Sequence, residues 1–215
     1  MENKKTIVLG IIAIVVLAGV VWYGSQNQEI IKQAASIIEN ITEEEPAAET
    51  EILEEFVLGN PEAPVTIIDY SSHFCGHCVA FHNQTLPFLI DEYVNDGRVK
   101  IIFRLLSPLE LGMSLLCAQE QGKFQKFNDI LFERAQELQS VDDIKAIAVE
   151  LNLNQDDFNQ CFDSEKYELR IKEWFNQAEE AGISGTPTFF INDQMITGNM
   201  PYIIFKEAIE QELAE

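Results

Sequence analysis

The chain has 215 residues, of which 47% are hydrophobic, and a formal net charge of −22 at pH 7. This length suits one domain of ordinary size with an additional segment, and the apolar content is enough to form a hydrophobic core. So acidic a chain is repelled by phosphate backbones, and we expect no nucleic-acid partner.

The first 23 residues have the pattern of a membrane anchor. Lys4 and Lys5 precede an apolar run over residues 6–23 that no charged residue interrupts. As a helix this run is about 27 Å long, close to the hydrocarbon thickness of a bilayer. The alternative is a cleaved signal peptide, for which the run is long and lacks a following Ala-x-Ala. We expect an uncleaved anchor, with the lysines in the cytoplasm and the rest of the chain extracytoplasmic, on the periplasmic or cell-surface side.

Residues 24–55 predict a tether. Apolar residues at helical spacing in residues 30–41 fit a helical stalk or a small dimerisation helix, and we expect a stalk and a monomeric protein. The acidic run in residues 43–51 has little to bury and is expected to be flexible.

Strands and helices are predicted for a folded domain over residues 56–215. Strands are expected at residues 55–58, 65–70, 99–105, 188–191 and 194–197, and helices at residues 76–95, with a bend at Pro87, and 201–213. A strand, a helix and a strand in succession indicate a βαβ unit with parallel strands. Residues 112–181 show only helical patterns. The fold class is therefore α/β with a helical insertion.

Cys75 and Cys78 form a Cys-x-x-Cys motif where a predicted strand ends and a helix begins. The free N–H groups and the partial positive charge of a helix N-terminus stabilise a thiolate, the form that attacks disulfides. Cys75 is the expected nucleophile and Cys78, one turn later, the resolving thiol; His77 adds a donor beside them. The tetrapeptide alone also fits half of a zinc site, with His73, His77 or His82, or an inert structural disulfide.

A second motif, Gly185-Thr186-Pro187-Thr188, precedes the apolar strand predicted at residues 188–191. Proline has no N–H for a strand ladder, so it belongs at the start or the edge of a strand. A cis peptide bond before Pro187 would make a tight, fixed turn. The alternative is an ordinary turn proline.

The two motifs, with Asp69 six residues before Cys75, resemble the thioredoxin superfamily. The sequence is most similar to its DsbA-like branch of extracytoplasmic thiol–disulfide oxidoreductases, and residues 58–65 and 117–124 also resemble that branch. The resemblance spans roughly residues 56–215 and does not cover the N-terminal quarter. It implies a thioredoxin fold that carries a helical domain as an insertion.

The resemblance also implies roles for further residues. In this superfamily a buried acid at the position of Asp69 assists proton transfer to or from the resolving cysteine; the alternative is a strand-end carboxylate that faces water. Apart from the resemblance, Arg104 is a candidate for countering the negative charge of Asp69. Thr186 and Pro187, joined by a cis bond, would offer a backbone edge to a client strand.

Cys117 and Cys161 fall on different predicted helices of the insertion. In an exported protein we expect them to form a structural disulfide. The alternatives are two buried thiols and a second redox pair.

The sequence predicts a dithiol oxidase that introduces disulfides into cysteine-containing exported proteins. We expect no bound cofactor or metal, because the cysteine pair is itself the redox centre. The family implies a quinone-linked membrane protein as the partner that reoxidises the pair. The alternatives are a reductase or isomerase of the same fold, and a non-catalytic metal- or client-binding module.

Overall fold

The structure is a computed structural model that describes residues 55–214. The predicted membrane anchor at residues 1–23 and almost all of the predicted tether lie outside the described residues. Within residues 55–214, no helix is both long enough and apolar enough to cross a membrane.

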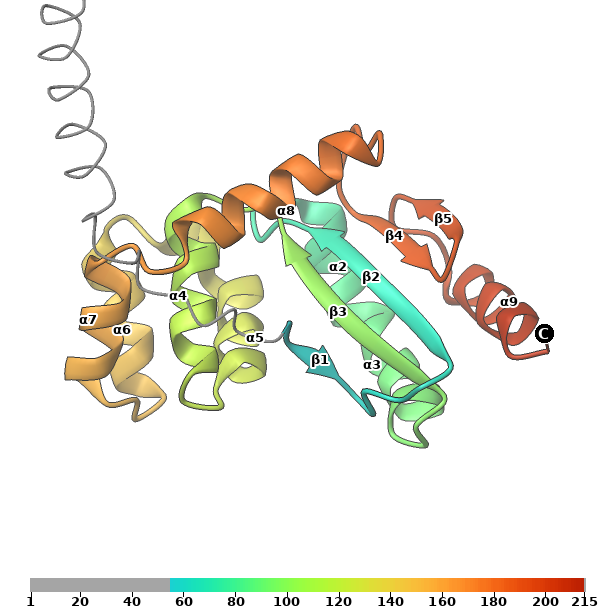
Figure 1. Cartoon of the computed structure of the whole chain (residues 1–215), viewed down its shortest axis with the longest axis horizontal. Coiled ribbons are helices and arrows are strands. Elements are labelled where there is room, and N and C mark those ends of the chain that lie inside the picture. Colours follow the sequence, from blue (N-terminus) through green and yellow to red (C-terminus); the bar gives the residue numbers. More distant parts are fainter. Residues whose placement is uncertain (1–54, 215) are drawn as a thin grey trace, which may run out of the picture. The chain divides into compact units, whose positions relative to one another are not determined.

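A five-stranded mixed sheet forms the centre of the described domain, in the order β1-β3-β2-β4-β5 (Figure 1). The strands are β1 (Val57–Leu58), β2 (Val65–Ser71), β3 (Val99–Leu105), β4 (Thr188–Ile191) and β5 (Gln194–Thr197). The strands β2 and β3 are parallel, as the βαβ prediction required, and the other neighbouring pairs are antiparallel.

The connection from β2 to β3 is helical but interrupted. It consists of α2 (Gly76–Gln84), α3 (Leu86–Leu89) and the π-helical turn η1 (Ile90–Val94). The sequence predicted a single helix bent at Pro87, whereas the structure breaks it at Thr85. Pro87 has no N–H to bond the carbonyl group of residue 83, so the hydrogen-bond ladder cannot continue through this position.

The insertion between β3 and β4 is entirely helical, as predicted. It contains α4 (Leu109–Gln119), α5 (Phe124–Arg134), the short 3-10 turn η2 (Ala135–Glu137), α6 (Val141–Glu150), α7 (Gln155–Asp163) and α8 (Glu168–Glu180). Ser140 caps α6 through a reciprocal capping box with Asp143, and Asn154 caps α7. These caps satisfy N–H groups that would otherwise lack partners, and they fix where each helix begins.

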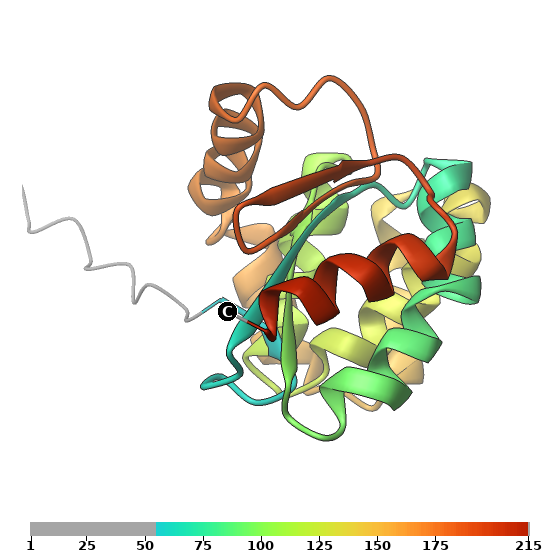
Figure 2. The same ribbon diagram turned by 90° about the vertical axis from the view of Figure 1, so that its right-hand side faces the viewer.

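Helices cover both faces of the sheet. Phe81 of α2, Phe189 of β4 and Phe205 of α9 (Tyr202–Glu212) pack together with ring centroids 4.3–5.3 Å apart, so α2 and α9 share one face. Figure 2 shows α9 lying across the sheet on this side. On the other face, Arg104 of β3 donates a hydrogen bond to Gln177 of α8 at 2.5 Å.

This topology determines what lies at one end of the sheet. The strand β4 runs antiparallel to β2, and Thr188 at its start pairs with Tyr70 near the end of β2. The residues just before β4 therefore lie beside the residues just after β2. The Gly185–Thr188 motif and the Cys-x-x-Cys motif, more than a hundred residues apart, meet at this edge.

Candidate active site

Cys75 lies at the N-cap of α2, after a short turn that follows β2. Its backbone is extended (φ −95°, ψ 115°), its N–H donates to the carbonyl oxygen of Ser72 at 3.0 Å, and its own carbonyl accepts from Val79. The Cys75 side chain is partly exposed, whereas Cys78 is completely buried. One sulfur atom is therefore accessible to another molecule and the second is shielded behind it.

The two thiols differ in acidity. Partial burial raises the pKa of Cys75, but hydrogen bonds with the side chains of Cys78 and Thr186 and with N–H groups of the first helical turn outweigh burial and lower this pKa. Burial is the main cause that raises the pKa of Cys78, followed by its hydrogen bond with Cys75. Cys75 is thus the acidic thiol of the pair, which is the arrangement that thiol–disulfide exchange requires.

The Thr186–Pro187 peptide bond is cis and lies next to Cys75. The Cys75 thiol donates to the carbonyl oxygen of Thr186 at 3.2 Å. Two further hydrogen bonds hold this loop in place: Gly198 N–H donates to the Pro187 carbonyl, and the Thr188 hydroxyl donates to the Gly185 carbonyl, both at 2.8 Å. The two motifs that the sequence singled out are thus in direct contact.

Asp69 on β2 is buried, which excludes the alternative of a carboxylate facing water. Burial raises the pKa of its carboxyl group to about 7, against a smaller opposite effect of the hydrogen bond that the Ser71 hydroxyl donates. The suggestion that Arg104 counters this charge is wrong. Asp69 pairs with Phe103 across the two strands, so the next residue, Arg104, points to the opposite face, where it contacts Glu55 at 2.7 Å.

The three histidines around the pair have different environments. His77 is exposed, and its backbone N–H is one of the donors near the Cys75 sulfur. His82 on α2 is 3.1 Å from Asp129 of α5, and His73 is completely buried. Among residues 55–214, no group of three or more His, Cys, Asp or Glu side chains is placed to hold a metal ion.

Comparison with known proteins identifies the family. A family model described as thioredoxin matches residues 51–211. The chain belongs to the thioredoxin family. Disulfide bond formation protein D of Bacillus subtilis is 25% identical over 169 residues, which cover 73% of this chain and 76% of that protein.

Solved structures of this family have the same fold. Alpha-DsbA1 of Wolbachia pipientis has a TM-score of 0.68 and 27% identity, with 76% of this chain and 92% of that chain covered. Oxidised BdbD of Bacillus subtilis has a TM-score of 0.66 and covers 75% of this chain and 94% of its own; at 23% identity it supports the fold alone. Together the comparisons identify a DsbA-like thiol–disulfide oxidoreductase, as the sequence motifs predicted.

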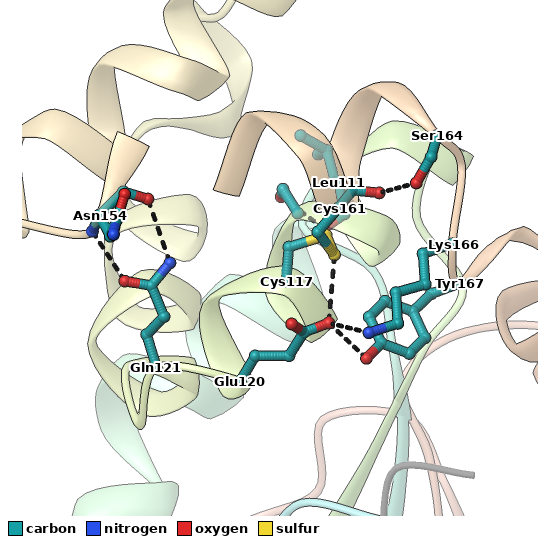
Figure 3. Close-up of a disulfide and its surroundings, with 10 residues drawn as sticks. Leu111, Cys117, Glu120, Gln121, Asn154, Cys161, Ser164, Lys166 and Tyr167 are labelled. Atoms are coloured by element: carbon teal, nitrogen blue, oxygen red, sulfur yellow. Dashed lines mark hydrogen bonds and ion pairs between the residues drawn. A yellow bond between two sulfur atoms is a disulfide. The ribbon is translucent and has the colours of Figure 1, made fainter. Parts of the chain in front are cut away.

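A disulfide between Cys117 of α4 and Cys161 of α7 lies within the helical insertion of this thioredoxin fold (Figure 3). Their Cα atoms are 5.8 Å apart. Beside the disulfide, Glu120 accepts hydrogen bonds from Tyr167 at 2.5 Å and Lys166 at 3.0 Å. Both cysteines are buried, and their bond connects the two helices.

Sequence reasoning missed two residues of the candidate site. Ser107, which follows β3, and Asn128 of α5 both hydrogen-bond to the His73 side chain. They are 34 and 55 residues away from His73 in the chain and belong to no motif. The parallel pairing of β2 with β3 places Ser107 beside His73, and the packing of α5 against the end of β2 places Asn128 there.

Proposed function

We propose that this protein is a membrane-anchored, extracytoplasmic dithiol oxidase that introduces disulfides into cysteine-containing exported proteins. The observation that carries the proposal is the asymmetry of the two thiols: Cys75 is partly exposed and acidic, whereas Cys78 is buried and has a raised pKa. A Cys-x-x-Cys pair whose nucleophile is stabilised as a thiolate has a more stable reduced form and is therefore a stronger oxidant.

The reaction begins with the Cys75–Cys78 disulfide. A client thiolate attacks the Cys75 sulfur, so that a client–Cys75 bond forms, the Cys75–Cys78 bond breaks, and the electron pair leaves on Cys78, which takes up a proton. A second client thiolate then attacks the client sulfur of this mixed disulfide. The client disulfide forms, Cys75 leaves as a thiolate, and two electrons have passed from the client to the pair.

The neighbouring residues have supporting roles in this proposal. Asp69 exchanges the proton with Cys78, since a buried carboxyl group whose pKa is about 7 can donate and accept protons near neutral pH. The backbone of Thr186 and Pro187, directly beside the Cys75 sulfur, pairs with an extended client segment, and such pairing gives affinity without dependence on sequence. His77 supplies an exposed hydrogen-bond donor next to the pair.

The location and the partner are parts of the same proposal. The apolar run at residues 6–23 supports a membrane anchor with an extracytoplasmic catalytic domain. Each turnover leaves two electrons on the cysteine pair, so a continuing oxidase requires an electron acceptor. A quinone-linked membrane protein would remove these electrons, and an anchored enzyme would meet it in the same bilayer.

The test uses the full chain in detergent and a reduced peptide with two cysteines. Oxidised wild-type protein should convert the peptide to its disulfide, while Cys75→Ser should have no such activity. Cys78→Ser cannot form the Cys75–Cys78 disulfide and should also leave the reduced peptide unoxidised. Given the oxidised peptide instead, its Cys75 thiolate should open the peptide disulfide and form a mixed disulfide that no Cys78 thiol can resolve. Peptide oxidation by Cys75→Ser at the wild-type rate would contradict the proposal.

A further inference from the structure

His73 is a buried ionisable residue that the exchange reaction does not use. It lies two residues before Cys75, and its ring is enclosed by parts of the chain distant in sequence. Its Nδ1 is 2.7 Å from the Ser107 hydroxyl and its Nε2 is 2.9 Å from the Asn128 amide oxygen. One side chain thus connects the turn before α2 to the end of β3 and to the insertion helix α5.

The hydrogen bonds of His73 are consistent with a single protonation state. The Ser107 oxygen accepts the backbone N–H of His73 at 2.9 Å, and in a neutral ring whose hydrogen is on Nε2 the Ser107 hydroxyl donates to Nδ1. The Asn128 oxygen is an acceptor only, so Nε2 is assigned the hydrogen. Burial, opposed by the Asn128 hydrogen bond and assisted by the nearby charge of His82, lowers the pKa of His73 to about 4. The ring is therefore neutral at physiological pH.

The backbone beside His73 contacts both cysteines. The peptide group that joins Ser72 to His73 donates its N–H to Ser107, and its carbonyl oxygen accepts the N–H of Cys75 at 3.0 Å. The N–H of Ser72 donates to the Cys78 sulfur at 3.4 Å. Moving the His73 ring would therefore displace hydrogen-bonding groups next to Cys75 and Cys78.

Aromatic packing supports the same connection. The Phe132 ring of α5 lies against both His73 and His82, with centroid distances of 4.5 Å and 4.2 Å. His82 belongs to α2 and also contacts Asp129 of α5. The helical insertion thus holds the turn before α2 and the helix itself through neighbouring rings.

We propose that His73 is a positioning residue of the redox centre: its neutral imidazole, held by Ser107 and Asn128, fixes the turn from Ser72 to Cys75 and thereby stabilises the Cys75 thiolate. The inference rests on the proposed function, and it gives the helical insertion a part in setting the reactivity of the pair. If the hydrogen bonds of the His73 ring were lost, the Cys75 thiolate would keep fewer well-aligned N–H donors. The reduced form would become less stable, and the enzyme would be a weaker oxidant.

Four substitutions in the full chain test this proposal. His73→Phe keeps a ring against Phe132 but removes both ring hydrogen bonds, and Ser107→Ala removes the partner while leaving His73 in place. His73→Gln is the conservative variant, because its amide can still donate to Asn128. His82→Phe is the matched control, since it alters the other ring on Phe132 without a hydrogen bond to the turn.

The readouts are the pH profile of Cys75 alkylation, the equilibrium with glutathione, and the free energy of unfolding. We expect His73→Phe and Ser107→Ala to shift the alkylation profile to higher pH. We also expect their glutathione equilibria to move about tenfold towards the disulfide form, equivalent to about 30 mV. His73→Gln should shift less than His73→Phe, and His82→Phe should stay within about twofold of the wild type.

A purely structural role would give a different result. Unfolding free energies would fall while the alkylation profile and the glutathione equilibrium stayed at wild-type values, and this would overturn the proposal. Equal shifts in His82→Phe and His73→Phe would also overturn it. If the wild-type pair did not exchange with glutathione at all, the proposed function would fail, while the alkylation profile would still test the role of His73.

Discussion

Asp69 has a carboxyl group that burial keeps protonated to unusually high pH. Its pKa is raised to about 7, against about 3.9 for aspartate in an unfolded chain. Between these values the folded state binds more protons than the unfolded state. The stabilising effect of this difference is therefore complete below about pH 4, is lost as the pH rises to about 7, and stays absent above that.

The Asp69→Asn variant should remove this pH dependence. Asparagine is similar in size, accepts the Ser71 hydrogen bond and never ionises. Above pH 7 we expect the variant to be more stable than the wild type by on the order of 4 kcal/mol, at 1.36 kcal/mol for each pKa unit, and the difference should vanish below about pH 4. Urea titrations of the reduced proteins between pH 4 and 8 measure this, and a difference independent of pH would contradict it.

The sequence predicted some residues of the site and missed others for physical reasons. Cys75, Cys78 and Pro187 could be predicted as candidates because each lies in a local pattern whose chemistry is readable from neighbouring residues. The role suggested for Arg104 was wrong. The register of β2 and β3 pairs Asp69 with Phe103 and therefore places the Arg104 side chain on the opposite face of the sheet, and this register cannot be read from the sequence. The environment of His73 depends on two distant residues, so no local pattern could predict it.

At the scale of elements, α4 and α8 approach closely at Gly112. A Cβ atom built on Gly112 would lie 2.8 Å from Cδ1 of Ile171, 3.0 Å from its Cγ1 and 3.1 Å from its Cγ2. Ile171 is completely buried, so its side chain has little room to move. The glycine is needed here for close packing between helices.

Gly112→Ala should therefore destabilise the protein although alanine favours helices. The helix propensity gain is about 1 kcal/mol, and overpacking costs about 1–3 kcal/mol, so we expect a net loss. Ile171→Val removes the nearest methyl group and should recover part of that loss in the double variant. Chemical denaturation of the two single variants and the double variant measures the coupling; strictly additive effects would be evidence against this contact.

The disulfide between α4 and α7 closes a loop with a sequence separation of 44 residues. In the chain-entropy model a loop of this length contributes roughly 4 kcal/mol, and measured values are commonly smaller. We expect the double variant Cys117→Ser/Cys161→Ser to have a lower free energy of unfolding by up to that amount. Unchanged stability relative to the oxidised wild type would show that the bond does not constrain the unfolded chain.

The elements themselves were largely predictable. Every predicted strand is present, although β1 is shorter than expected. The strands β2, β3 and β4 are rich in apolar residues, and β5, which is mostly exposed, follows the Asn192-Asp193 turn of a hairpin. The insertion was predicted at residues 112–181, and its helices extend over residues 109–180, since Leu109 can continue the helical pattern directly after Pro108. The sequence placed the interruption of this helix at Pro87, two residues after its actual position at Thr85. A proline disrupts the hydrogen bonds of the preceding turn as well as its own.

At the scale of the whole molecule, the fold brings one partly exposed acidic thiol, one buried thiol and a cis-proline loop to the same edge of the sheet. The antiparallel pairing of β4 with β2 produces this arrangement. The helical insertion contributes Asn128 and Phe132, which pack against the turn that carries Cys75. The environment of the pair is thus a property of the assembled domain, beyond that of the Cys-Gly-His-Cys sequence.

The reduction potential of the Cys75–Cys78 pair is the most direct measure of the central claim, that this enzyme is an oxidant. It is obtained by equilibrating the full chain in detergent with glutathione buffers and counting free thiols. A stabilised Cys75 thiolate predicts a potential between about −120 and −180 mV, the range of oxidants and isomerases of this superfamily. A potential near about −270 mV, the value of thioredoxin, would contradict the oxidase and indicate a reductase.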